Sequence, residues 1–349
     1  MKFRNLGRTG VKVSVLCLGC MNFGGRTNEM DSIEIIKDAL DVGINFIDTA
    51  NVYGHDPDNY QFGRGRSEQI VGKALKEMGH REQVILATKV HFPISKDPNA
   101  QGNSRRHIID QCTASLKRLQ TEYIDLYQLH HPSSEIPIDE TLRALDDLIH
   151  RGWVHYIGTS TFAAWQLVES LWVSKEYGLN RFISEQPVYH LLDRRIEREL
   201  VPMAQTYGIA LMTWSPLAGG FLTGRYRRNE PIPPGSRYDV FWKSSAMSQF
   251  TDKAFDIVEE VERLSTEKGC SPAQLALAWV LHQPGITSVI IGPRTREQLE
   301  DCLGALEISL NKNDLEYLDN LALPGRVTVP FYGVDGLAWT AWGPHLLRW

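Results

Sequence analysis

Four side chains that can donate, accept or stabilise a proton follow apolar segments of the chain. In chain order they are Asp48, Tyr53, Lys89 and His130. Taken singly, a lysine that ends an apolar strand would ordinarily reach into solvent, and a histidine is more often a structural residue. In a parallel α/β barrel, however, the strand ends and the loops after them form one face, on which active sites are built. The four side chains are therefore expected to be neighbours in space.

The chemistry that this set favours is proton donation by the phenol of Tyr53. A tyrosine with an ordinary pKa of about 10 is a poor acid at neutral pH. A nearby ammonium group, that of Lys89, stabilises the phenolate and is expected to lower this pKa, while the Asp48 carboxylate holds the lysine in place. His130 beside the phenol can orient a substrate carbonyl by hydrogen bonding.

The segments that must position these side chains alternate between strand and helix. Eight apolar, β-favouring runs predict strands at 15–18, 44–47, 84–87, 124–129, 154–158, 182–184, 209–213 and 288–291. Amphipathic stretches predict helices near 31–42, 67–78, 104–119, 138–150, 162–177, 195–207, 251–268 and 296–304, with a further helical run near 312–322. This alternation is typical of an α/β fold of the (β/α)8 TIM-barrel type, which would make residues 1–349 a single domain.

The competing fold is a doubly wound sheet that binds a dinucleotide through a glycine-rich turn. The one stretch that approaches such a turn is Gly63-Arg64-Gly65-Arg66-Ser67-Glu68. The dinucleotide-binding motif requires a third glycine and a strand directly before it. This stretch has neither. The pattern therefore favours the barrel.

Four segments lie outside the repeat. Residues 53–66 form a long polar loop after the second strand. Residues 2–13 predict a hairpin that closes the bottom of the barrel. Residues 224–250, rich in Pro, Gly and Arg, form a long loop after the seventh strand, and loops of this length are usually functional. Residues 324–349 form a C-terminal tail that is expected to help wall the substrate pocket; its aromatic residues are Phe331, Tyr332, Trp339, Trp342 and Trp349.

Composition narrows the classes of protein and partner. The chain has 42% hydrophobic and 23% charged residues, enough for a sizeable core, and its net charge of −5 argues against a nucleic-acid partner. No apolar run approaches the length of about 20 residues needed to cross a bilayer, so no membrane insertion is expected. These features predict a cytoplasmic protein; a homo-oligomer is compatible with them.

The five cysteines are scattered and are expected to be reduced thiols. The pair Cys17 and Cys20 has the spacing of half a metal or redox site but lacks a second pair. Because the two lie on or just after a predicted strand at an odd spacing, their side chains should point to opposite faces. No metal site is predicted.

Motifs on separate segments together resemble the aldo-keto reductase family over nearly the whole chain. They are Phe46-Ile47-Asp48-Thr49-Ala50 with Tyr53-Gly54, Thr88-Lys89, Leu129-His130-His131-Pro132, Gly158-Thr159-Ser160 and Trp214-Ser215-Pro216-Leu217. The resemblance implies a barrel that binds NADPH in extended form and reduces a small-molecule carbonyl substrate. It also implies that Tyr53 is the acid, that Lys89 and Asp48 tune it, and that His130 orients the substrate.

The same resemblance implies where NADPH or NADP+ would bind. Ser160 and Gln186 match positions that hold the nicotinamide carboxamide, and Trp214 matches the ring that stacks on the nicotinamide. Met21 and Asp48 are assigned to the cofactor site as well. The remaining matches, from the pyrophosphate to the adenosine end, are Ser215, Leu217, Gly219, Arg225, Arg237, Gly292, Arg294, Gln298 and Asp301.

Cofactor choice depends on the residues after the eighth strand. Arg294 with Thr295 would suit a 2′-phosphate, because a guanidinium matches phosphate geometry, and this favours NADPH over NADH. Two positions depart from the family pattern. Thr161 stands where an asparagine often follows the serine, and Cys302 stands where an asparagine often contacts adenine.

A rival function comes from one branch of the same family. The string 212–218 and the Gly-Arg-Tyr at 224–226 resemble the branch that contains potassium-channel β subunits. That likeness implies the alternative of a redox-sensing regulatory subunit that binds NADPH with little turnover. Against it, the branch has asparagine at the position of His130, so a stand-alone reductase is favoured. Phe23, Phe92 and Tyr53 further suggest an aromatic-lined pocket for bulky carbonyls.

Overall fold

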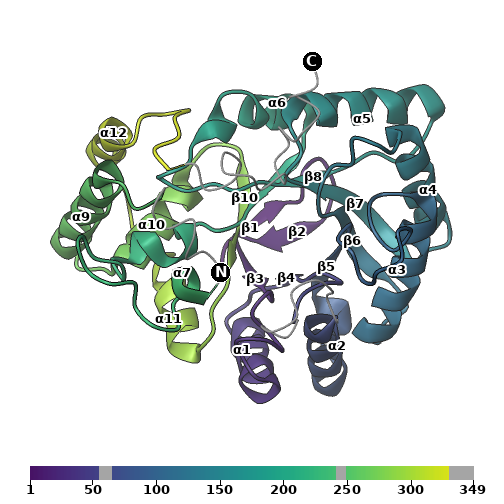
Figure 1. Ribbon diagram of the computed structural model, residues 1–349, viewed down its shortest axis with the longest axis horizontal. Helices are drawn as coiled ribbons and strands as arrows, with labels where there is room; N and C mark the ends of the chain where they lie inside the picture. Colours follow the sequence, from purple (N-terminus) through teal and green to yellow (C-terminus); the bar gives the residue numbers. More distant parts are fainter. Residues whose placement is uncertain (55–64, 241–248, 330–349) are drawn as a thin grey trace.

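Eight parallel strands form a closed barrel in the computed structural model, which describes residues 1–54, 65–240 and 249–329 (Figure 1). The strands follow one another around the ring in chain order, and the last strand pairs with the first. They are β3 (Leu16–Gly19), β4 (Phe46–Asp48), β5 (Ile85–Val90), β6 (Ile124–Leu129), β7 (Val154–Ser160), β8 (Ser184–Gln186), β9 (Ala210–Thr213) and β10 (Ile286–Ile291). Every predicted strand is present, with ends shifted by a few residues, so the TIM barrel is confirmed.

Helices connect the strands and cover the outside of the barrel (Figure 1). Those that match the predictions are α1 (Glu29–Asp41), α2 (Arg66–Met78), α3 (Arg105–Leu119), α4 (Ile138–His150), α5 (Ala164–Tyr177), α6 (Leu200–Tyr207), α9 (Asp252–Glu267) and α11 (Arg296–Gly304). The further run near 312–322 is α12 (Lys312–Leu321). Among the described residues, no helix is both long and apolar enough to cross a membrane.

One helix was not expected. Helix α10 (Pro272–His282) lies between α9 and β10, where the strict alternation allowed for a single helix. Its residues from 275 to 281 are all buried, so it lacks the polar face that an amphipathic pattern requires. The available signal was its start, where Ser271 and Gln274 exchange two hydrogen bonds of 3.1 Å as a capping box.

The N-terminal hairpin closes one end of the barrel, as predicted. Strands β1 (Phe3–Asn5) and β2 (Lys12–Ser14) pair antiparallel, and Figure 1 shows them across the centre of the ring. Leu6 and Val13 are fully buried against inward-facing barrel side chains, including Phe46. The hairpin therefore covers the barrel interior at the end opposite the carboxyl ends of the strands.

Two apolar clusters separate the inside of the barrel from its helical shell. Cys17 belongs to the inner cluster, with the hairpin residues, whereas Cys20 belongs to the outer cluster between strands and helices. The expected opposite orientation of the two thiols is thus confirmed. Burial raises the pKa of both thiols well above the ordinary value.

The shell includes a close contact between α2 and α3 at Gly72. A Cβ atom added there would lie 2.4 Å from the oxygen and 2.5 Å from the carbonyl carbon of Leu119, both backbone atoms. We expect Gly72→Ala to lower the free energy of unfolding by about 1–3 kcal/mol, because the helices must move apart. The measurement is urea denaturation; Gly10→Ala, with nothing within 4 Å of its added Cβ, is the control. Equal stability of the two variants would contradict the expectation.

The long loop after β9 is folded against helix α9. It contains the 3-10 helix η3 (Ala218–Thr223) and the short helix α7 (Arg237–Val240). Aromatic rings pack together at its base, with centroids 4.6 Å apart for the closest pair; they are Phe221, Tyr226, Tyr238, Phe250 and Phe255. Arg228 forms ion pairs with three carboxylates of α9, those of Asp252, Asp256 and Glu259.

The segment that leads to the C-terminal tail lies along the loop after β8. The backbone nitrogens of Thr328 and Val329 donate to the Leu192 carbonyl oxygen at 2.9 and 3.0 Å, and Arg194 N donates to Arg326 O at 2.9 Å. This loop follows the carboxyl end of a barrel strand, so the chain reaches the face where the site is expected. Residues 330–349, to which the prediction about the tail mainly refers, lie outside the described residues.

Candidate active site

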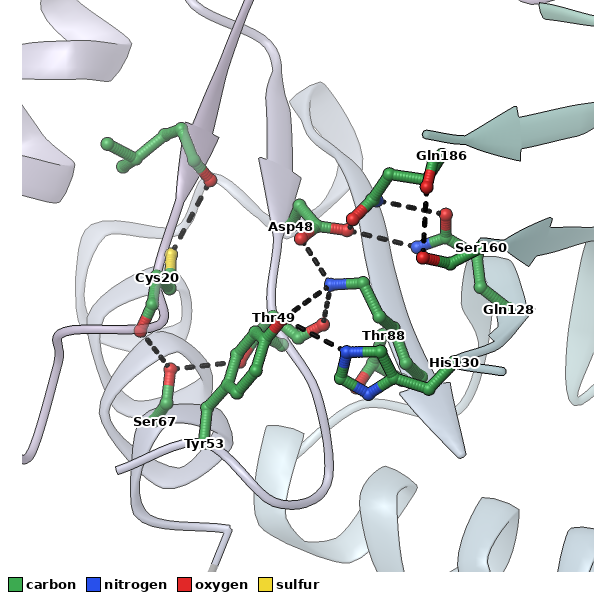
Figure 2. A network of polar contacts seen from close by, with 12 residues as sticks. Cys20, Asp48, Thr49, Tyr53, Ser67, Thr88, Gln128, His130, Ser160 and Gln186 are labelled. Carbon is green, nitrogen blue, oxygen red and sulfur yellow. Dashed lines mark hydrogen bonds and ion pairs between the residues drawn. The ribbon is translucent and has the colours of Figure 1, made fainter. Parts of the chain in front are cut away.

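The structure brings the four sequence-predicted side chains into contact at the carboxyl ends of β4, β5 and β6 (Figure 2). Lys89 is fully buried, and its Nζ donates to the Asp48 carboxylate and, at 2.9 Å, to the carbonyl oxygen of Thr49. The same Nζ donates to Tyr53 Oη at 3.3 Å. Tyr53 Oη lies 3.3 Å from Nε2 of His130, with the two rings edge to face.

Tyr53 reaches this position because the chain turns sharply after β4. Its backbone nitrogen donates to Ala50 O at 3.1 Å, which closes a turn, and Ser67 N donates to Tyr53 O at 3.2 Å. The next residue, Gly54, has φ of 81°, and a Cβ there would lie 2.6 Å from Ser67 N and 2.7 Å from Phe23 O. Only glycine combines this backbone conformation with such a close approach to α2.

The pKa of Tyr53 differs in direction from the prediction. Burial raises it above the ordinary value, and the neighbouring Lys89 ammonium opposes the rise without reversing it. The predicted net lowering is therefore wrong for the protein alone, although Lys89 acts in the predicted direction. The phenol keeps its proton at neutral pH, as a proton donor must, and the ammonium remains in place to stabilise the phenolate that donation would leave.

The pKa values of the two basic neighbours move in opposite directions. Burial acts to lower the pKa of Lys89, but Asp48 and Tyr53 outweigh this and raise it, so the side chain stays an ammonium. Burial, followed by the charge of Lys89, holds the pKa of His130 well below its ordinary value. His130 is thus a neutral imidazole, which can hydrogen-bond a carbonyl without adding a positive charge.

A fifth polar residue, Gln128 on β6, was not predicted. Its Nε2 donates to Oδ1 of Asp48 at 3.0 Å, and Nε2 of Gln186 donates to the same oxygen at 2.9 Å (Figure 2). Asp48 therefore receives Lys89 on one oxygen and two amides on the other. The available signal was an amide near the end of a predicted strand, at the alternate-residue spacing that places it on the same face as His130.

The residues assigned to the nicotinamide end lie at neighbouring strand ends. Ser160 ends β7 and its Oγ donates to the carbonyl oxygen of Gln186 at the end of β8, at 3.0 Å. Trp214 directly follows β9, and its ring is half-buried. Thr161, which departs from the family pattern, has φ of 63°. A β-branched residue is strained in this left-handed region, whereas asparagine tolerates it.

The loop assigned to the pyrophosphate has an unusual backbone. Ser215, Ala218, Gly219 and Gly220 all have positive φ, at 53°, 49°, 66° and 93°. Left-handed residues next to right-handed ones turn successive N–H groups to one side, which creates a concavity suited to an anion. Leu217 lies between them and is half-buried.

Three guanidinium groups from two distant segments share one region. Burial lowers the pKa of Arg294, and the charges of Arg225 and Arg237 lower it further, so both of these arginines lie within electrostatic reach of Arg294. Arg237 also acts on Tyr53, and its Nη2 contacts the sulfur of exposed Met21 at 3.6 Å. A cluster of like charges of this kind attracts anionic ligands.

Hydrogen bonds fix the backbone of Arg294 and the neighbouring helix α11 after β10. Its backbone nitrogen donates to Oε1 of Gln298 at 2.8 Å, close to the N-terminus of α11, while Gly292 is exposed. Asp301 accepts a hydrogen bond of 2.7 Å from Ser271, so its carboxylate also joins α11 to α10. Cys302 is buried in the outer core cluster.

The expected aromatic wall is only partly present. Phe92 is half-buried, and its ring packs on that of His130 at 4.7 Å between centroids. Phe23 is fully buried in the outer core cluster, so its assignment to the pocket is wrong. Its apolar surroundings between β3 and α2 could not be distinguished from a pocket wall before the packing was known.

Comparison with known proteins identifies the family. Residues 15–323 match the model of the aldo/keto reductase family. This match spans the whole barrel and contains all four side chains at the carboxyl ends of β4 to β6. The chain belongs to the aldo/keto reductase family.

Relatives of this aldo/keto reductase family member carry different names. It is 42% identical over 336 residues to the Bacillus subtilis (strain 168) protein named uncharacterized oxidoreductase YrpG, covering 93% of this chain and 97% of that one. It is 36% identical over 312 residues to a probable voltage-gated potassium channel subunit beta of Arabidopsis thaliana, covering 88% and 92%. It is 33% identical over 351 residues to the versiconal hemiacetal acetate reductase of Aspergillus parasiticus, covering 94% and 98%. The family and these names support an oxidoreductase.

Proposed function

We propose that the protein reduces aldehydes and ketones to alcohols with NADPH, reversibly, and that Tyr53 supplies the proton. The observation that carries this proposal is the contact of a buried ammonium with a half-buried phenol whose other neighbour is a neutral imidazole. A pocket with a proton donor and a hydrogen-bond donor side by side can receive one carbonyl oxygen. The name of the Aspergillus parasiticus relative, a reductase, supports the same reaction class.

Each of the four side chains has a separate role in the proposed reaction. His130 Nε2 and Tyr53 Oη, 3.3 Å apart, hydrogen-bond the carbonyl oxygen and polarise the carbonyl group. NADPH, when bound, supplies a hydride to the carbonyl carbon. Tyr53 transfers its proton to the oxygen, and the resulting phenolate is stabilised by Lys89 at 3.3 Å. Asp48 keeps Lys89 charged and aimed at the phenol.

The chain offers groups that fit the phosphates of the cofactor. Four residues of the loop after β9 have left-handed backbone, a conformation that recurs in anion-binding turns, and the charges of Arg225 and Arg237 reach Arg294. Every nicotinamide dinucleotide has a pyrophosphate that such a turn can bind, and NADPH has in addition a 2′-phosphate that a separate cation can bind. We assign the pyrophosphate to Ser215, Leu217 and Gly219, and the 2′-phosphate to Arg294.

The direct test is a panel of aldehydes and ketones assayed by the loss of NADPH absorbance. Turnover of simple and aromatic aldehydes, with NADPH consumed in equal amount to the alcohol formed, is the expected result. The absence of turnover on every member of the panel, with NADPH bound, would reject the enzyme proposal.

A second candidate function is a redox-sensing channel subunit. It is favoured by the likeness to proteins of Arabidopsis thaliana and Schizosaccharomyces pombe named probable and putative voltage-gated potassium channel subunit beta, at 36% and 37% identity. A regulatory subunit would bind NADPH tightly, turn over slowly and co-purify with a membrane channel. Rapid multiple turnover in the carbonyl panel would favour the enzyme instead.

A prediction about cofactor choice follows from Arg294. We expect Arg294→Ala to raise Kd for NADPH about 10- to 100-fold, the effect of losing a charge-assisted contact to phosphate, and to change Kd for NADH little. Fluorescence titration with both cofactors measures it. Arg296→Ala, which removes an exposed guanidinium paired with Asp38, is the control. Equal losses for NADPH and NADH would contradict the assignment.

A further inference from the structure

Gln128 is a fully buried amide inside the barrel. It lies on β6 on the same face as Leu126, a member of the inner apolar cluster, and its Cα is paired across the sheet with that of Lys89. A buried amide without partners costs free energy, so a glutamine at this place must have both a donor and an acceptor nearby. Both are present.

Gln128 connects Asp48, which the proposed mechanism uses, with Gln186, which the family resemblance assigns to the nicotinamide carboxamide. Its Nε2 donates to Asp48 Oδ1 at 3.0 Å, and its Oε1 accepts from Gln186 Nε2 at 3.1 Å. Gln186 Nε2 also donates to Asp48 Oδ1 at 2.9 Å, so the three side chains form a closed triangle (Figure 2). Asp48 belongs to the proton-donating side of the site and Gln186 to the cofactor side.

The triangle of Asp48, Gln128 and Gln186 spans strand β7, which has no side chain at the position paired with Gln128. Gly158 on β7 is paired with Gln128 on one side and with Ser184 on the other. A Cβ at Gly158 would lie 2.2 Å from Ser184 Oγ and 3.2 Å from Leu126 Cδ1. The glycine therefore leaves the inner face of β7 open, and the Gln128 amide can reach from β6 to β8.

We infer that Gln128 is a positioning residue, which fixes the Asp48 carboxylate for Lys89 and the Gln186 amide for the cofactor at once. This inference rests on the proposed function. Both hydrogens of Gln186 Nε2 are donated within the triangle. The side-chain atom that Gln186 can offer to a ligand is therefore its amide oxygen, Oε1. That oxygen can accept a hydrogen bond from the amide group of a nicotinamide carboxamide.

Only a side chain that donates and accepts at the same time can do this. Leucine at position 128 does neither. An ionised glutamate accepts from Gln186 but repels Asp48, whereas a protonated glutamic acid can again donate to Asp48. Two carboxyl groups in contact share one proton, and the ammonium of Lys89 keeps the charge on Asp48, so the proton resides on the introduced side chain.

One native group beside the triangle titrates near neutral pH: burial raises the pKa of Glu185, which precedes Gln186 on β8, to about 8, but Glu185 is common to wild type and both variants. The pKa values of Lys89, Tyr53 and the Cys17 thiol are raised above their ordinary values, and that of His130 is well below its own. Gln186 on β8 does not ionise. A pH dependence that appears only in Gln128→Glu therefore reports the introduced carboxyl group.

The test compares wild type, Gln128→Leu and Gln128→Glu for kcat, KM and NADPH Kd between pH 6 and 9. We expect Gln128→Leu to lower kcat about 10- to 100-fold, the effect of losing a hydrogen bond to a charged group, and to raise Kd for NADPH severalfold at every pH. Gln128→Glu should resemble Gln128→Leu at pH 9 and recover toward wild type as the pH falls. A role in packing alone would move neither the NADPH Kd nor the pH profile.

The control is Asn45→Leu at the opposite end of β4. Asn45 also uses both ends of its amide, accepting from Ser14 N at 2.7 Å and donating to Lys12 O at 3.0 Å, but it holds the hairpin. Its loss should lower Tm and leave kcat, KM and Kd unchanged. If Gln128→Leu does not fold, the pH-dependent recovery of Gln128→Glu decides the question.

Two outcomes distinguish a failure of the proposed function from a failure of the role inferred for Gln128. A wild-type protein that binds NADPH and reduces no carbonyl would reject the proposed function itself. A wild-type protein that turns over, with Gln128→Glu showing a flat pH profile and wild-type kcat and Kd, would overturn the role of Gln128 alone.

Discussion

Replacing Tyr53 with phenylalanine is expected to lower kcat for aldehyde reduction by about 10²–10⁴-fold, the usual contribution of general acid catalysis. The substitution removes the proton donor and keeps the ring, which packs edge to face on His130. The Kd for NADPH should barely change, because the phenol belongs to the substrate side of the site. Steady-state kinetics with a simple aldehyde and fluorescence titration of NADPH measure the two effects.

The control is Tyr127→Phe. Tyr127 is fully buried, and its hydroxyl donates to Ile108 O at 3.3 Å on the outer side of the barrel. Its loss should reduce stability slightly and leave kcat intact. If Tyr53→Phe keeps most of its kcat on an unactivated aldehyde, Tyr53 is not the proton donor and the mechanism is wrong.

Replacing Lys89 with methionine is expected to lower kcat by at least about 100-fold. Burial already raises the pKa of Tyr53, and without the ammonium the phenolate left by proton transfer would lose its main stabilising charge. The same change leaves the Asp48 carboxylate buried without its cation, which should lower the free energy of unfolding by about 3–5 kcal/mol. Kinetics and urea denaturation of the variant measure both effects.

A second substitution separates stability from catalysis. Adding Asp48→Asn to Lys89→Met removes the unpaired charge, so stability should largely recover while kcat stays low. Combining Lys89→Met with Tyr53→Phe should be little worse than either alone, because the pair acts as one unit. Losses that multiply fully would indicate that Lys89 acts on something other than the phenol.

Several features of the barrel could be predicted because they depend on local pattern. The eight strands lie on or directly after short apolar runs, and strand and helix alternate with little interruption. Helix α10 was not predicted because it is buried on nearly all sides, so its sequence has no amphipathic period to detect. Its capping box was a local signal that hydrophobic periodicity does not measure.

The sequence by itself determined that Asp48, Tyr53, Lys89 and His130 would meet, because parallel strands in a barrel place all their carboxyl ends on one face. Only the tertiary structure decided that Gln128 closes a triangle with Asp48 and Gln186. That contact depends on three strands and on the missing side chain at Gly158, none of which is local. The tertiary structure also decided the direction of the Tyr53 pKa shift. It is the balance of burial against the Lys89 charge, and burial is a property of the packed barrel that no segment carries alone.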